Sequence, residues 1–268
     1  MSANIHEFTC TGPVETEIEL GAGALLVTAG DDLTATVSIT PADGREGSRA
    51  AAEASTVEFD RDRLTIHTPR NNGWSILRGG GNLRVEIRLP VDSSVHARVG
   101  SADIRTVGRL GNVDIKTGSG DIVIDQTSGD VRIQSGSGDI RAEQVVRDMH
   151  VTTASGDVTA VCVLGTTSIK AASADLVLDD AQGPVHLNTA SGDIRIGAVR
   201  GPELHAHSAS GDVLVGVPAG TKVWLDLSTI SGSTASDLHM TGEPVADGPV
   251  ATVQVRTISG DIQIRRVA

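Results

Sequence analysis

An aspartate recurs from residue 103 onward inside the tetrad Ser-Gly/Ala-Asp-Ile/Val/Leu, and a regular row of carboxylates could bind cations. Successive copies are 18 residues apart from Asp103 to Asp193, and after Asp193 the spacing is no longer 18 residues. If each copy is one turn of a stack, adjacent carboxylates lie about 5 Å apart. Ca²⁺, which needs several oxygen ligands, is one candidate occupant. The full set is Asp103, Asp121, Asp139, Asp157, Asp175, Asp193, Asp212 and Asp261.

A structural role for these aspartates is the alternative interpretation. A short Asp side chain accepts hydrogen bonds from turn amides, and the Gly before it permits the turn. Fixed amide donors would also keep the carboxylates ionised against their mutual repulsion. Ser233 replaces the Asp in one copy, and Ala102 and Ala174 replace the Gly in two others. This tolerance favours turn formation over a metal shell.

Histidines supply a second candidate site. His150, His186 and His205 occupy the same outward position of the repeat, and His207 follows two residues later on the same face. A one-residue slip before Asp212 leaves the alignment of His205 with His186 open. If the alignment holds, His186, His205 and His207 lie within reach of one another and could bind Zn²⁺. Isolated surface histidines are the alternative.

No set of residues indicates catalysis. Serines are abundant but belong to the repeated turn, whereas an active site needs a unique arrangement. The sequence has no G-x-S-x-G, Walker or dinucleotide-binding motif. Breaks in the repeat at 69–82 and 233–249 contain no convincing acid and base. We predict no catalytic residue and no cofactor.

The elements that position these residues follow from the repeat itself. Each 18-residue unit holds two short stretches in which apolar residues alternate with polar ones, such as Val113-x-Ile115 and Ile122-x-Ile124. A lone strand pair cannot bury its apolar face, but stacked copies can. We therefore predict an all-β fold, a parallel β-solenoid of the β-helix or β-roll kind, with 18-residue coils of two strands each. Ile122, Ile140, Val158, Leu176 and Ile194 should form one interior file.

Residues 1–98 are predicted to form a strand-rich cap continuous with the solenoid, and residues 99–268 the repeat array. Within the cap, Glu46 to Ser55 is a loop or short helix, and Pro69 to Asn82 is a Gly/Asn-rich loop. A further loop, Thr241 to Pro249, interrupts the last coils. The exposed last coil could pair with a second copy, which would give a homo-oligomer through this open end. Alternatively, the charges of Arg265 and Arg266 could prevent such pairing.

Charge and composition restrict the partners. The chain has 268 residues and a net charge of −12, so a nucleic-acid phosphate backbone and an anionic membrane surface would both be repelled. No apolar run is long enough to span a bilayer. We expect two reduced, partly buried thiols at Cys10 and Cys162. The N-terminus does not look like a secretory signal, so we expect a cytoplasmic protein.

Two tryptophans stand out because aromatic residues are only 1% of the chain. Trp224 alternates with Val223 and Leu225, which favours packing in a strand. Trp74 belongs to the Gly/Asn-rich loop together with Ile76 and Leu77. These three residues form a candidate partner contact; the alternative is that they fold back on the cap.

The S-G-D-I repeats resemble the bacterial putative-adhesin β-strand-repeat domain, also called the toastrack domain. The resemblance also includes Leu83 to Pro90 (LRVEIRLP) and Leu25 to Asp31 (LLVTAGD), and it covers nearly the whole chain. Its motifs identify the fold better than a function. Some members are extracellular parts of cell-envelope stress systems, which implies sensing or scaffolding roles, and the family supplies no catalytic residues.

These observations predict a non-enzymatic structural or interaction protein: a rigid, acidic β-solenoid that presents repeated faces to a protein partner. The alternatives are a ligand- or envelope-stress-sensing module that works with a membrane complex, and a metal-binding solenoid.

Overall fold

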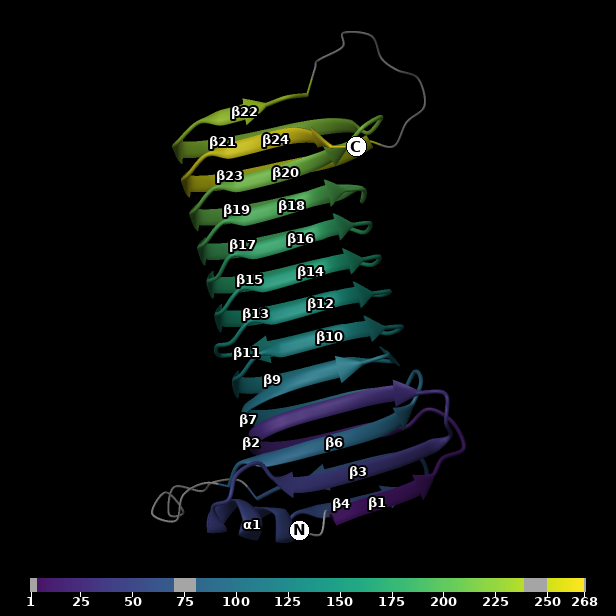
Figure 1. The fold of residues 1–268 in the computed structure, drawn as a ribbon. Coiled ribbons are helices and arrows are strands. Elements are labelled where there is room, and N and C mark those ends of the chain that lie inside the picture. Colours follow the sequence, from purple (N-terminus) through teal and green to yellow (C-terminus); the bar gives the residue numbers. More distant parts are fainter. Residues whose placement is uncertain (1–3, 70–80, 239–249, 268) are drawn as a thin grey trace. The chain divides into compact units, whose positions relative to one another are not determined.

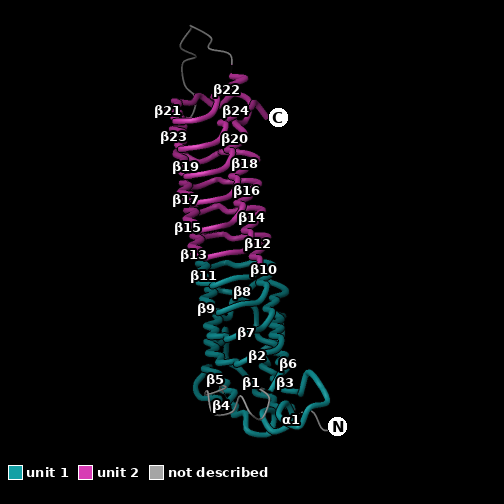
Figure 2. Tube along the Cα trace, turned by 90° about the vertical axis from the view of Figure 1, so that its left-hand side faces the viewer, with its two compact units in different colours: residues 1–138 teal, residues 139–268 magenta. Residues whose placement is uncertain are grey.

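The computed structural model describes residues 4–69, 81–238 and 250–267, which contain 24 strands and one helix (Figure 1). The chain divides into two compact units, residues 1–138 and 139–268 (Figure 2). The first holds all of the predicted cap and the first coils of the repeat array.

The second unit is a stack of two-stranded coils, as the repeat predicts. Strands on each side pair in parallel with their equivalents one coil away. One side contains β13 (Met149–Ser155), β15 (Thr167–Ser173), β17 (Val185–Ser191), β19 (Glu203–Ser210), β21 (Lys222–Ser231) and β23 (Val250–Ser259). The other contains β12 (Ile140–Val145), β14 (Val158–Val163), β16 (Leu176–Ala181), β18 (Ile194–Val199), β20 (Val213–Pro218), β22 (Thr234–Ser236) and β24 (Ile262–Val267).

The core of this unit consists of interior files of aliphatic side chains. Ile140 pairs with Val158, Val158 with Leu176, and Leu176 with Ile194. These four side chains are at most 1% exposed. In the first unit, Ile104 pairs with Ile122 in the same way. The predicted interior file is thus present within each unit, and the 18-residue period is what places equivalent residues side by side.

The last coils do not stack in the order of the sequence. β23 pairs with both β19 and β21, and β24 pairs with both β20 and β22. Among the described strands, β21 and β22 therefore form the coil that ends the stack. The expectation that the C-terminal coil with Arg265 and Arg266 is the exposed one was wrong. Val253 and Val255 of β23 take the position covered from both sides, and both are 0% exposed.

Chain order and spatial order also differ in the first unit. β9 (Val113–Ser119) pairs with β7 (Ser94–Val107), and β7 pairs with β2 (Glu15–Gly30), all in parallel. β2 also pairs in parallel with β5 and β6. The remaining elements are β1 (Asn4–Thr9), β3 (Thr34–Pro41), α1 (Glu46–Glu53), β4 (Thr56–Asp60), β5 (Arg63–His67), β6 (Leu83–Pro90), β8 (Arg109–Leu110), β10 (Ile122–Thr127) and β11 (Val131–Ser135).

The beginning of the chain closes this unit with antiparallel strands. β3 pairs with β6, β1 with β3, and β4 with β5. The two phenylalanines of the chain meet here, because the rings of Phe8 and Phe59 stack at 4.9 Å. The segment Glu46 to Ser55, predicted as a loop or short helix, forms the helix α1. The buried Ser48 hydroxyl donates a hydrogen bond to the Asp43 carboxylate and accepts one from the backbone N–H of Asn82. Most of the two predicted loops lies outside the described residues, as do Trp74, Ile76 and Leu77.

Candidate functional site: the aspartate ladder and two polar faces

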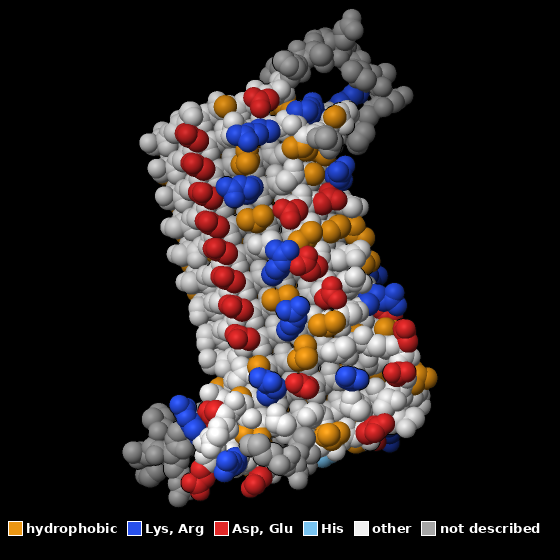
Figure 3. Space-filling view, in the orientation of Figure 1, with side chains coloured by type: hydrophobic (Ala, Val, Ile, Leu, Met, Phe, Trp, Pro, Cys, Tyr) orange, Lys and Arg blue, Asp and Glu red, His pale blue; other side chains and the backbone are white. Residues whose placement is uncertain are grey.

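The repeated aspartates form a hydrogen-bonded ladder. In the second unit, Oδ1 of each Asp accepts a hydrogen bond from the backbone N–H of the equivalent residue one coil away. Figure 3 shows acidic side chains in a regular file. The acceptor and donor pairs are Asp139–Asp157 (2.9 Å), Asp157–Asp175 (3.0 Å), Asp175–Asp193 (2.8 Å), Asp193–Asp212 (2.8 Å) and Asp212–Asp261 (2.8 Å).

The ladder ends at the one copy that lacks the aspartate. Ser233 donates both its backbone N–H (2.7 Å) and its hydroxyl (2.9 Å) to Oδ1 of Asp261. These two bonds hold the pKa of Asp261 below its usual value. In the first unit, Asp121 donates its N–H to Asp103 at 3.1 Å. Each carboxylate thus stabilises the turn of the coil next to its own, rather than its own turn.

Where a glycine precedes the aspartate, it lets two coils approach closely. Gly192 has a φ of 132°, and a Cβ on it would lie 2.0 Å from the carbonyl oxygen of Ala174 on the adjacent coil. A side chain there would collide with backbone, which cannot move without breaking the ladder. The tetrad therefore encodes the turn and the coil-to-coil contact together.

Two of the three candidate zinc histidines lie against each other. His186 pairs in register with His205, and their rings stack at 5.2 Å. Nε2 of both rings lies near the Glu203 carboxylate, at 3.6 Å and 3.7 Å. His207 pairs instead with Asn188, two residues further along the strand. Over the ranges that the structure describes, no three His, Cys, Asp or Glu side chains form a group that could hold a metal ion.

The histidine pair belongs to a longer polar chain on the outer face. Nδ1 of His205 contacts the Gln254 side-chain oxygen at 2.9 Å, and the Gln254 amide donates to Asp226 at 2.6 Å. Arg256 pairs with the same carboxylate at 3.5 Å. Because β23 lies between β19 and β21, this series of polar contacts joins residues that are distant in sequence.

Trp224 does not pack in the interior. Its side chain is 57% exposed on the outer face of β21. The interior positions of this strand belong to its neighbours Val223 and Leu225, and side chains of a strand alternate between faces. The expectation of a packed Trp224 was therefore wrong.

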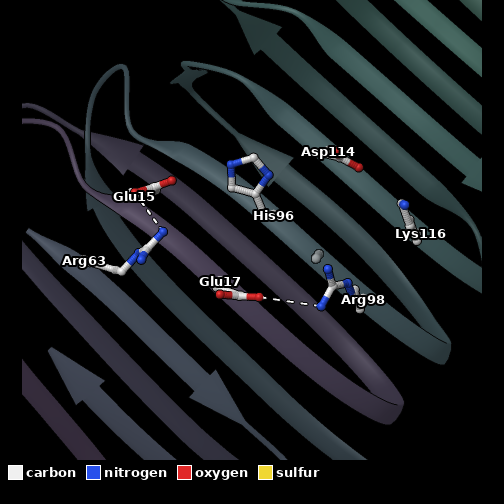
Figure 4. A pocket seen from close by; sticks show the side chains of 8 residues that line it. Glu15, Glu17, Arg63, His96, Arg98, Asp114 and Lys116 are labelled. Atoms are coloured by element: carbon white, nitrogen blue, oxygen red, sulfur yellow. Dashed lines mark ion pairs between the residues drawn. The ribbon is translucent and has the colours of Figure 1, made fainter.

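A charged face in the first unit had no signal in the sequence. β2, β5, β7 and β9 place Glu15, Glu17, Arg63, Arg98 and Lys116 around a shallow hollow of about 280 Å³ (Figure 4). Glu15 pairs with Arg63 at 3.3 Å, and Glu17 with Arg98 at 3.7 Å. The elements that carry these pairs are far apart in the chain, so no local spacing predicts the contacts.

Two further polar side chains, His96 and Asp114, line the same hollow. His96 of β7 pairs in register with Asp114 of β9, and Arg98 pairs with Lys116. In the portion of the chain that is described, His96, Asp114 and Lys116 take part in no ion pair. They are therefore available to a charged group from outside the molecule.

Both cysteines are free thiols. Burial raises the pKa of Cys10 and of Cys162, and the nearby Asp180 adds to the effect at Cys162. Neither thiol is activated as a nucleophile, because activation requires a lowered pKa. Separately, no described helix has the length and apolarity needed to cross a membrane.

Comparisons with known proteins match most of the chain. The model of the family described as Toastrack DUF4097 matches residues 27–265. No curated protein matches. Among solved structures, a putative lipid binding protein from Parabacteroides distasonis is 13% identical over 99% of this chain and 97% of its own, with a TM-score of 0.49. A putative adhesin from Bacteroides fragilis is 14% identical over 99% and 97%, with a TM-score of 0.38.

Proposed function

The chain belongs to the Toastrack DUF4097 family, and we propose that it is a non-enzymatic interaction protein whose charged face in the first unit binds a protein partner. The observation that carries this proposal is the arrangement around the hollow of Figure 4, where the ion pairs of β2, β5 and β7 lie beside Asp114 and Lys116 of β9.

The paired charges give this face a fixed pattern. Neighbouring parallel strands lie about 4.8 Å apart, so their outward side chains have a set spacing. Arg98 lies 3.7 Å from both Glu17 and Glu19, and this bridge restrains its long side chain. A partner therefore meets charges that are already ordered, which reduces the entropy lost on binding.

The unpaired charges provide the complementary contacts. Asp114 and Lys116 alternate on the outer face of β9, with His96 beside Asp114. A partner surface that presents a base and an acid at the same separation would pair with both. Charge pairs of this kind determine which partner binds and how fast it associates more than they determine total affinity.

The experiment exchanges the two charges without altering net charge. D114K/K116D and the wild-type chain are used to capture proteins from a lysate of the source cells, and each captured protein is then purified for affinity measurement by calorimetry. We expect the exchange to weaken binding of the true partner about tenfold or more.

The matched control is a charge exchange in the second unit. Arg141 and Glu143 form an exposed ion pair at 2.6 Å, and R141E/E143R keeps both the pair and the net charge. This control should bind the partner as the wild type does. Equal affinity of D114K/K116D and wild type for every purified partner would remove the charged face from the proposal.

A further inference from the structure

Strand β21 ends the stack of the second unit with an unpaired edge. It pairs with β23 on one side, and no described strand pairs with it on the other. Its inward side chains Val223, Leu225 and Leu227 are only half-buried, whereas their equivalents Val253 and Val255 in β23 are 0% exposed. A ten-residue strand without proline, whose second edge pairs with no described strand, is a template for pairing with another strand.

The direction of the free backbone groups follows from the register. The N–H of Thr167 donates to the Pro184 carbonyl of the following coil at 2.8 Å. From coil to coil, Thr167 pairs with Val185, Val185 with Leu204, Leu204 with Val253, and Val253 with Leu225. Leu225 therefore occupies the same register position as Thr167. Because backbone groups alternate sides along a strand, the N–H and C=O of Leu225, and those of the residues two before and two after it, point out of the open end.

We propose that two copies of the chain pair through this edge, with β21 antiparallel to β21 of the second copy about a two-fold axis at Trp224. Val223 then lies opposite Leu225 of the other copy and exchanges backbone hydrogen bonds with it. Trp224 lies opposite its own equivalent on the outer face. The half-buried inward side chains of both copies become covered.

Charge complementarity identifies the occupant as a second copy. In this register Lys222 lies opposite Asp226 of the other copy, and the two-fold axis repeats the pair on both sides of Trp224. Lys222 has no ion pair within the described ranges. Asp226 already accepts a hydrogen bond from Gln254 and forms an ion pair with Arg256, but a carboxylate can accept about four hydrogen bonds. A self-complementary edge of this kind makes an isologous interface, which closes at two copies.

A charge-exchange experiment on the full chain tests this register. Sedimentation equilibrium should show a dimer for the wild type. K222D alone places Asp opposite Asp226, and D226K alone places Lys opposite Lys222, so each should raise the dimer dissociation constant about tenfold or more. An equimolar mixture of K222D and D226K restores both opposite-charge pairs, and should form a heterodimer; the double variant K222D/D226K should form a homodimer.

The control variant is K170D, because Lys170 lies on the outer face of β15, within the stack. It should leave the dimer unchanged, and circular dichroism checks that each variant is folded. A wild type that stays monomeric would overturn the proposal, whether β21 is covered by another part of the chain or by a different protein. A dimer that K222D and D226K do not weaken, or that their mixture does not restore, would overturn the register at Trp224.

Discussion

Oδ1 of Asp175 accepts a hydrogen bond from the backbone N–H of Asp193, one coil further along the stack, at 2.8 Å. D175A removes the acceptor and leaves this amide without its protein partner. We expect the free energy of unfolding to fall by about 1–2 kcal/mol, as for loss of a hydrogen bond to a charged group at a solvent-exposed site. Chemical denaturation measures the change.

D175N separates the hydrogen bond from the charge. The Asn oxygen can still accept from the Asp193 amide, and the neutral side chain removes repulsion between neighbouring carboxylates. We expect its stability to lie within about 0.5 kcal/mol of the wild type. D179A, at an exposed position of the same coil, is the control for loss of a carboxylate. Wild-type stability of D175A would mean that the ladder does not stabilise the stack.

The lowered pKa of Asp261 gives the end of the ladder a pH dependence. A carboxyl whose pKa is lower in the folded than in the unfolded chain stabilises the fold above about pH 3.9, and this stabilisation is lost as the pH falls through the folded value. S233A removes one of the two donors to Asp261. We expect the pKa of Asp261 to rise toward its usual value, as measured by NMR titration of the carboxyl group.

The stability of S233A should follow the same titration. It should be less stable than the wild type near neutral pH, and the difference should shrink once Asp261 is protonated in both proteins. S231A, in the same turn, removes an exposed hydroxyl that has no such role. A difference between S233A and wild type that persists unchanged to low pH would exclude the hydrogen bond to ionised Asp261 as its cause.

Gly192 is required by the contact between coils. An Ala there would have both an unfavourable positive φ and a Cβ 2.0 Å from the Ala174 carbonyl oxygen. We expect G192A to lower the free energy of unfolding by about 1–3 kcal/mol or to prevent folding. G44A is the control, because nothing lies within 4 Å of a Cβ at Gly44. Equal melting temperatures for the two variants would contradict this role.

The raised pKa values of the two thiols predict slow alkylation. At pH 7 little thiolate is present, so iodoacetamide should modify native Cys10 and Cys162 more slowly than the same thiols in guanidinium. The rate should rise with pH above the usual thiol value of about 8.5. Mass spectrometry should find Cys162 modified first, because Cys10 is the more buried. Rapid modification of Cys10 at pH 7 would contradict its burial.

The sequence predicted the coils because their stabilising contacts repeat locally. An inward residue such as Val158 meets its equivalents 18 residues away on either side, so the period alone identifies its neighbours. The order of the last coils was not predictable in this way. Both β21 and β23 present alternate apolar residues to the interior, and either could follow β19. Only the completed stack shows that β23 is covered on both sides.

The charged face was missed for a related reason. Glu17 meets Arg98 because β2 inserts beside β7, although the two residues are 81 positions apart. Ionic contacts between distant strands have no period that a sequence reveals. Trp224 was misassigned because both of its neighbours are apolar, and the strand register rather than hydrophobicity decides which of the three faces outward.

The stacked rings of Phe8 and Phe59 couple the first strand of the chain to β4. Ring pairs of this geometry contribute about 0.5–1.5 kcal/mol beyond the area they bury. In a double-mutant cycle of F8L, F59L and the double variant, we therefore expect a coupling energy in that range, measured by hydrogen exchange of amides in β1 and β4. Leu keeps the site apolar, so the cycle isolates the ring–ring contact from burial. Additive effects of F8L and F59L would show that the two rings do not stabilise each other. The antiparallel pairing of β1 with β3 and of β4 with β5 would then close this unit without a contribution from the ring–ring contact.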